Sequence, residues 1–158
     1  MPNLESSYYK YLECRHRYKY VLLNSFGNNI RFNGKQIYSN ATQSIFSINS
    51  LKEQINRFYR FRIFTCSDAG KKFLFSLQYN SMELCEKSRS VAQQIDCIED
   101  AFIFLRAFDP LAYLREHYAF YHLPEPDQEY LIKLQHYWDV FMLQNEEFLR
   151  NYVGSSHV

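Results

Sequence analysis

Glycine is scarce in this sequence, with only four Gly among 158 residues. So few glycines exclude the Gly-rich loops that cradle phosphate groups in nucleotide-binding proteins. The four cysteines form no CxxC pair, and no histidine stands at a spacing that would complete a zinc site. We therefore expect no metal and no cofactor, and we interpret the thiols as free and packed like small apolar groups. These are Cys14, Cys66, Cys85 and Cys97.

The chain also lacks a long hydrophobic run and the marks of a known catalytic motif. No stretch of 18 apolar residues could span a membrane, and the N-terminal sequence has no basic start followed by an apolar segment. No serine stands in a nucleophile elbow, and no carboxylates can be paired from their spacing. We expect a soluble cytoplasmic protein that is not an enzyme. An active site assembled only in three dimensions stays open as an alternative, because such sites are defined by geometry.

Large apolar side chains, by contrast, are abundant in this sequence. Hydrophobic residues make up 47% of the chain and aromatic residues 18%, which excludes a disordered protein. The charges are unevenly divided: residues 1–110 hold 15 Lys or Arg against 10 Asp or Glu, whereas residues 111–158 hold 3 against 7. This asymmetry indicates two modules of opposite charge that attract each other.

A stretch of the first module repeats after 47 residues without a gap. Residues 33–38 align with residues 80–85, and the helical spacing that follows stays in register. A duplicated small unit buries its apolar face by stacking on its neighbour, so the repeat predicts the architecture of residues 17–109. The aligned apolar positions are Ile48, Leu51, Ile55 and Phe58 in one copy and Ile95, Ile98, Phe102 and Leu105 in the other.

Each copy is expected to fold as a β-β-β-α unit, the first over about 17–59 and the second over about 60–109. The first has strands over 18–23, 30–32 and 36–38, with a tight turn at Asn33 and Gly34, because Asn-Gly is the strongest short hairpin signal. The second has strands over 58–64, 73–77 and 82–86, with Asn80 and Ser81 at the matching turn. Helices are expected over 48–58 and 95–108. The predicted class is α+β.

The pattern of the second copy resembles the YegP-like repeat, a small bacterial domain of unknown function that usually occurs in tandem. The resemblance is carried by Phe73-x-Phe75-x-Leu77-x-x-Asn80, by Leu84 and by the helix with Glu99-Asp100-Ala101-Phe102. In the first copy Asn33-Gly34 with Ile37 matches the same step. The resemblance covers residues 16–108 and implies two three-stranded antiparallel sheets, each with its helix. It implies no catalytic residues.

Beyond Pro110 the sequence predicts an acidic helical hairpin over 110–153, followed by a disordered tail over 154–158. Residues 1–16 are expected to form a separate segment before the repeat body. Its second helix carries a stripe at heptad spacing with one polar member, Asn145. Asparagine at such a position fixes register in coiled coils, so the stripe is a candidate for self-association; packing back onto the repeat body would give the same pattern. The stripe contains Leu131, Leu134, Trp138, Phe141, Asn145, Phe148 and Tyr152.

The function predicted first is a protein-interaction or self-association module, with a protein partner or a second copy. The alternative is binding of single-stranded nucleic acid, because basic and aromatic residues interleave on two strands as they do in RNA-binding sheets. The candidate residues for this alternative are Arg57, Tyr59, Arg60, Arg62, Lys71 and Lys72.

Overall fold

The computed structural model describes residues 18–42, 55–67 and 72–156, and the fold is α+β as predicted. Three helices are described: α2 (Ile98–Ala107), α3 (Ala112–Phe120) and α4 (Gln128–Ser156). The strands are β1 (Tyr20–Leu22), β2 (Ile30–Phe32), β3 (Gly34–Ala41), β4 (Arg57–Cys66), β5 (Phe73–Ser81) and β6 (Arg89–Ile95).

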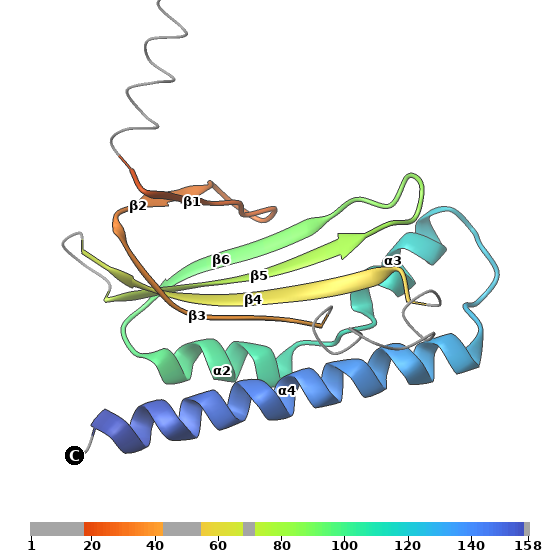
Figure 1. Cartoon of the computed structure of the whole chain (residues 1–158). Helices are drawn as coiled ribbons and strands as arrows, with labels where there is room; N and C mark the ends of the chain where they lie inside the picture. Colours follow the sequence, from red (N-terminus) through yellow and green to blue (C-terminus); the bar gives the residue numbers. More distant parts are fainter. Residues whose placement is uncertain (1–17, 43–54, 68–71, 157–158) are drawn as a thin grey trace, which may run out of the picture.

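The strands form two antiparallel sheets stacked as separate layers. β1 and β2 pair only with each other, and the larger sheet has the order β3-β4-β5-β6. The small sheet lies on one side of the larger sheet, whereas α2 and α4 lie side by side against the other (Figure 1). α3 stands at one end of the large sheet, near the segment that joins β5 to β6 (Figure 1).

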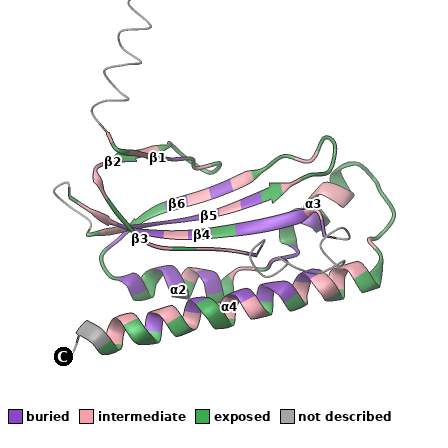
Figure 2. Ribbon diagram, viewed as in Figure 1, coloured by how far each residue is buried: buried purple, intermediate pink, exposed green. Residues whose placement is uncertain are grey.

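Alternating side chains on β4 and β5 build the main core against the helices. Phe61 and Ile63 of β4 are fully buried on this face, where they join Phe75, Phe102 of α2 and Phe141 of α4. Successive strand residues point to opposite faces, so one row of aromatic and β-branched side chains buries the apolar stripes of both helices. Figure 2 shows the buried residues of α2 and α4 on the sides that face the sheet.

The small sheet closes a second cluster on the other face. Leu22 and Phe32 pack on Phe64 and Leu74 of the large sheet, together with Ala92. The turn after β1 also binds the β6 edge: the Ser25 amide donates to the Ser90 carbonyl at 2.7 Å, and the Ser90 amide donates to Ser25 Oγ at 2.9 Å. These bonds satisfy backbone groups that an edge strand otherwise leaves open.

The expected hairpin at Asn33 and Gly34 is wrong. Asn33 is the one residue between β2 and β3, but β2 pairs with β1 and β3 pairs with β4, so the chain passes between layers there. Gly34 is required for a different reason than turn formation. A Cβ atom on Gly34 would lie 1.8 Å from the Thr65 carbonyl oxygen of β4, so only glycine lets the two strands approach this closely.

The expected turn at Asn80 and Ser81 is also wrong. Both residues lie in β5, paired with Phe58 and Arg57, and the third strand of this copy is β6 at 89–95 instead of 82–86. Residues 82–88, which we call the connection, reverse the chain, and Cys85 has a positive φ of 67°. The aligned spacing could not reveal that Glu86 turns inward to pair with an arginine of β4.

Two tandem units are therefore not confirmed. Residues 57–107 do run strand, strand, strand, helix, and α2 falls within the predicted 95–108. The first three strands, however, are divided between two sheets. Most of the helix expected over 48–58 lies outside the described residues, and its last positions, Arg57 and Phe58, belong to β4.

The C-terminal hairpin is likewise not confirmed as a separate module. α3 and α4 exist, but α4 runs along α2 and the large sheet (Figure 1). α4 also continues through Gly154 to Ser156, into the segment expected to be a tail. Apolar side chains of α4 are part of the main core. The apolar stripe of a long helix can be buried by any apolar face that the fold places against it.

Substituting Gly34 tests the close approach of β3 to β4. We expect Gly34→Ala to lower the free energy of unfolding in urea by about 3 kcal/mol, the upper end for an overpacked site. Gly154→Ala is the control, because nothing lies within 4 Å of its added Cβ and alanine favours a helix by about 0.5–1 kcal/mol. Equal stability of Gly34→Ala and the natural protein would contradict the steric account.

Candidate functional site

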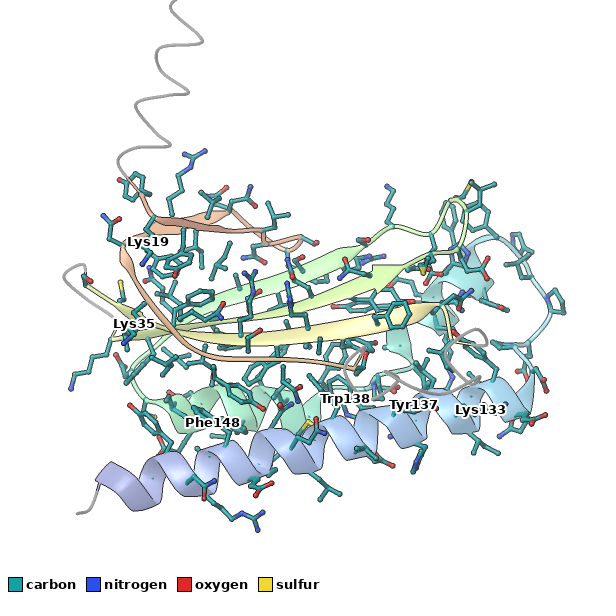
Figure 3. All side chains as sticks on the ribbon, viewed as in Figure 1. Lys19, Lys35, Lys133, Tyr137, Trp138 and Phe148 are labelled. Atoms are coloured by element: carbon teal, nitrogen blue, oxygen red, sulfur yellow. The ribbon has the colours of Figure 1, made fainter. Side chains whose placement is uncertain are left out.

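The stripe of α4 that we considered for self-association packs on the protein's own core. Trp138, Phe141 and Asn145 are buried, as is Leu134, and Leu131, Phe148 and Tyr152 are partly buried against the same clusters. Figure 3 shows Trp138 and Phe148 on the side of α4 that faces the sheet. Phe148 stacks on Tyr38 of β3, with ring centroids 4.0 Å apart. The stripe is therefore used within one copy of the chain.

Asn145 connects α4 to β3. Its Oδ1 accepts hydrogen bonds from the Tyr38 hydroxyl at 2.6 Å and from Asn40 Nδ2 at 3.1 Å. Burial raises the pKa of Tyr38 to about 12, against a smaller lowering by the hydrogen bond with Asn40, so the phenol stays protonated and remains a donor at neutral pH. The polar position in the apolar stripe thus fixes the helix on the sheet.

The residues considered for nucleic acid lie on different surfaces. Arg57 and Tyr59 are buried, and the Tyr59 hydroxyl donates to the Pro110 carbonyl at 2.6 Å. Arg60 is exposed and Arg62 half-buried on the face that carries the small sheet. Lys72 is exposed where β5 begins, and Lys71 lies outside the described residues. One strand cannot present all of these side chains together, because its residues alternate between faces.

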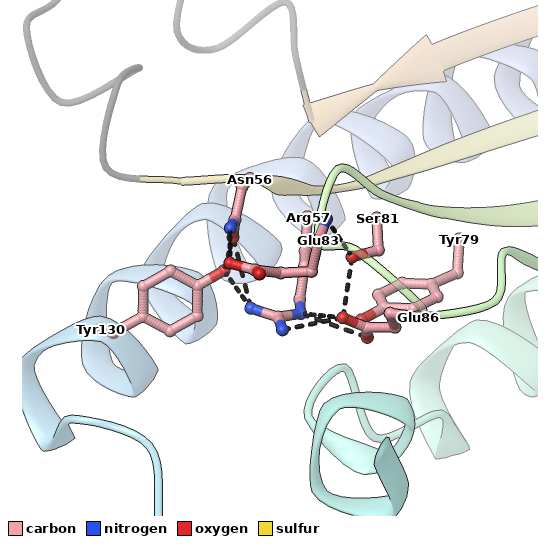
Figure 4. A network of polar contacts seen from close by, with 7 residues as sticks. All are labelled: Asn56, Arg57, Tyr79, Ser81, Glu83, Glu86 and Tyr130. Atoms are coloured by element: carbon pink, nitrogen blue, oxygen red, sulfur yellow. Dashed lines mark hydrogen bonds and ion pairs between the residues drawn. The ribbon is translucent and has the colours of Figure 1, made fainter. Parts of the chain in front are cut away.

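The most deeply buried charges are Arg57 of β4 and Glu86 of the connection (Figure 4). Each side chain is only 3% exposed. Arg57 Nε donates to Glu86 Oε2 at 2.9 Å, and the guanidinium Nη2 lies 2.8 Å from the same oxygen. Such a two-bond pairing of guanidinium with carboxylate is among the stronger polar contacts in proteins.

Further side chains complete the network on both sides of this pair. Glu86 also accepts from the Tyr79 hydroxyl and from Ser81 Oγ, the latter at 2.7 Å. Arg57 Nη1 donates to the Tyr130 hydroxyl at 3.0 Å, and that hydroxyl donates to Asn56 Oδ1 at 2.7 Å. The network therefore joins β4, β5, the connection and the first turn of α4 (Figure 4).

Its electrostatics keep Glu86 ionised. Burial alone would raise the pKa of this carboxyl, but hydrogen bonds from Arg57, Tyr79 and Ser81 outweigh burial and lower the pKa. Because the pKa is depressed in the folded protein, the stability from this group is present above the ordinary glutamate pKa. That stability is lost as the pH falls through the lowered value. Both oxygens of the Glu86 carboxylate thus accept hydrogen bonds from side chains of the same chain.

Two cavities adjoin the ion pair. One, of about 200 Å³, has Cys85, Glu86, Arg89, His117 and Phe120 among its lining residues. The other, of about 570 Å³, lies toward α4 and is lined by Arg57, Glu83, Tyr118, Tyr130 and others. Arg57 stands over the Tyr118 and Tyr130 rings, 5.8 and 5.6 Å from their centroids, so these rings already hold a cation.

Large apolar side chains are exposed beside the smaller cavity. Leu84 is 88% and Phe120 74% exposed, although the two residues come from the connection and from the end of α3. The sequence pattern does not identify Leu84 and Phe120 as exposed. It places Leu84 in a strand and includes Phe120 in no apolar stripe of a helix. We call this set the connection surface. It consists of Met82, Leu84, Phe120, Tyr121 and Leu123.

The thiols differ from the expectation that they are packed as apolar groups. Cys66 is half-buried, Cys85 and Cys97 are exposed, and Cys14 lies outside the described residues. Cys85 is at the reversal of the connection, and Cys97 precedes the first residue of α2, so both occupy surface turns. Cys85 and His117 line one cavity, but no hydrogen bond joins them within the part of the chain that the structure describes.

Charge is strongly segregated between the layers. Residues 18–42, 55–67, 72–81 and 89–95, which contain all six strands, hold eight Lys or Arg and no Asp or Glu. Residues 82–88 and 96–156 hold five Lys or Arg and thirteen Asp or Glu. Arg57 pairs with Glu86 and Arg89 with Glu116, which leaves six cations of the strand regions without an ion pair among the described residues. These are Lys19, Arg31, Lys35, Arg60, Arg62 and Lys72.

Among residues 18–42, 55–67 and 72–156, no three His, Cys, Asp or Glu side chains are grouped so that they could hold a metal ion. None of the described helices has the length and apolar character needed to span a bilayer.

Comparison of the chain with protein-family models, with curated proteins and with solved structures found no match. The resemblance to the YegP-like repeat therefore stays a prediction.

Proposed function

We propose that this protein is a non-enzymatic module that binds another protein through the connection surface. The observation that supports this most is the exposure of Phe120, which lines the smaller cavity, and of Leu84, which directly precedes the lining residue Cys85. Exposed apolar patches mark interaction sites on many proteins, and aromatic side chains such as Phe120 are enriched where partners bind.

The connection surface stands on a rigid support. Glu86, two residues after Leu84, is bound by Arg57, Tyr79 and Ser81. On the α3 side, Arg89 of β6 donates to Glu116 at 2.7 Å and stands over the Tyr113 ring at 5.3 Å. A surface that is already ordered loses little conformational entropy when a partner binds.

Self-association through the α4 stripe is less favoured than this surface. Phe141 and Asn145 are fully buried, so a coiled coil would require α4 to leave the core. A second copy remains a candidate partner at the connection surface. Catalysis is not favoured, because the buried Glu86 carboxylate is occupied by donors from its own chain.

The connection surface can be tested with matched variants. We expect Leu84→Ser with Phe120→Ser to weaken capture of the partner from a cell extract about 10-fold or more, because losing apolar anchors costs about 2 kcal/mol or more. Ile132→Ser with Leu143→Ser is the control, because these side chains are exposed on α4 away from the surface. Circular dichroism should show equal folding of both double variants.

Light scattering on the full chain separates the two kinds of partner. A dimer that becomes a monomer in the Leu84→Ser, Phe120→Ser variant identifies the partner as a second copy. Equal loss of capture in the α4 control, or full capture by the connection variant, would contradict the proposal.

Single-stranded nucleic acid is the second candidate partner, because six cations of the strand regions form no ion pair with any residue that the structure describes. Lys19 and Lys35 lie at one end of the molecule (Figure 3). We expect oligonucleotide binding that falls with salt and is roughly 10-fold weaker in Lys35→Glu with Lys72→Glu, since each lysine neutralises phosphate. Arg150→Glu, an exposed position of α4, serves as the control. No retention at low salt would eliminate this candidate.

A further inference from the structure

Two polar side chains face each other across neighbouring strands on the side of the large sheet that carries β1 and β2. Arg62 of β4 is paired in register with Ser76 of β5, and Ser76 is paired with Ala92 of β6. Residues paired in this way point to the same face of a sheet. Arg60 lies two residues before Arg62 and therefore on the same face, opposite Gln78.

Both groups are buried without a hydrogen-bond partner. Ser76 is 1% exposed, and within the described residues neither its Oγ nor Arg62 Nε has a donor or acceptor in reach. Nearly all buried donors in native proteins are satisfied, and a bound water or ion is one cause of an exception. Two such groups on adjacent strands point to one shared ligand.

Charge argues that this ligand is an anion. Neither Arg60 nor Arg62 forms an ion pair among the described residues, and the strand regions contain no Asp or Glu that could reach them. The Arg62 guanidinium does stand over the Phe64 ring, 5.4 Å from its centroid, which compensates part of its charge. Burial, together with the like charge of Arg60, lowers the pKa of Arg62. A water molecule would satisfy the hydrogen bonds but would leave the half-buried Arg62 charge without an anion among the described residues.

The surrounding structure holds these donors in place. The small sheet packs on Phe64 and Leu74, a pair that lies two residues along each strand from Arg62 and Ser76 and on the same face. Its turn is fixed to β6, because Asn24 Nδ2 donates to the Ala92 carbonyl at 3.3 Å and Ser25 bonds to Ser90. β1 and β2 are thus anchored on two sides of the polar patch.

We propose that Arg60, Arg62 and Ser76 form a binding site for a phosphate group on the large sheet, beside the small sheet. Two guanidinium groups match the two negative charges of a phosphate at neutral pH, and the serine hydroxyl supplies a further donor. The phosphate is either free or carried by a nucleotide. The site uses none of the residues of the connection surface, so it stands or fails independently of the proposed partner binding.

The thermal midpoint of unfolding tests this site with inorganic phosphate as the probe. We expect phosphate to raise the midpoint of the natural protein above its value in sodium chloride of equal ionic strength, because a ligand that binds only the folded state stabilises it. Arg62→Met should abolish this rise. The same substitution should increase the midpoint in chloride, since it removes a half-buried unpaired charge. Arg31→Met, an exposed arginine of β2, should retain the full phosphate response.

Ser76→Ala offers a conservative second variant that preserves the charges. We expect its phosphate affinity, measured by calorimetry, to fall several-fold. Replacing phosphate by thymidine oligonucleotides identifies the source: a rise at lower concentration that Arg62→Met also abolishes assigns the phosphate to a nucleotide chain. An equal rise in the natural protein and in Arg62→Met, or no rise with either probe, would overturn the site.

Discussion

The buried ion pair between Arg57 and Glu86 is the constraint on which one end of this fold depends. It joins the first residue of β4 to the connection after β5, and through Tyr130 it reaches the first turn of α4. Removing one partner of such a pair leaves an unpaired buried charge, which costs about 3–5 kcal/mol. The position of the exposed connection surface therefore follows from a contact made inside the protein.

The separation of charge gives the two sides of the molecule different chemistry. The strand regions are purely basic and the connection and helices are mainly acidic, so the layers attract each other across the aromatic core. On the face of the small sheet, this arrangement leaves Arg60 and Arg62 of β4 without an ion pair within the described part of the chain. The proposed protein partner would thus occupy an apolar surface, and the proposed phosphate group a separate, cationic one.

The sequence predicted the individual strands and helices better than it predicted which of them pair or pack together. Alternating aromatics placed β4 and β5, and apolar spacing placed α2 and α4, because these patterns record burial on one face. It misassigned Asn33 and Gly34, since a turn signal cannot show that two strands enter different sheets or that Thr65 lies against a glycine. Glu86 gave no signal either, because its meaning depends on an arginine 29 residues earlier. The exposure of Leu84 and Phe120 could not be predicted either, because the sequence does not show which apolar side chains the fold leaves uncovered.

A double-mutant cycle on the ion pair tests the central claim most directly. The free energy of unfolding would be measured at neutral pH for Arg57→Met, Glu86→Gln and the double variant. The account predicts that each single variant loses about 3–5 kcal/mol and that the double variant loses clearly less than the sum of the two. Single losses below about 1 kcal/mol, as for an exposed pair, or strictly additive losses would contradict the account.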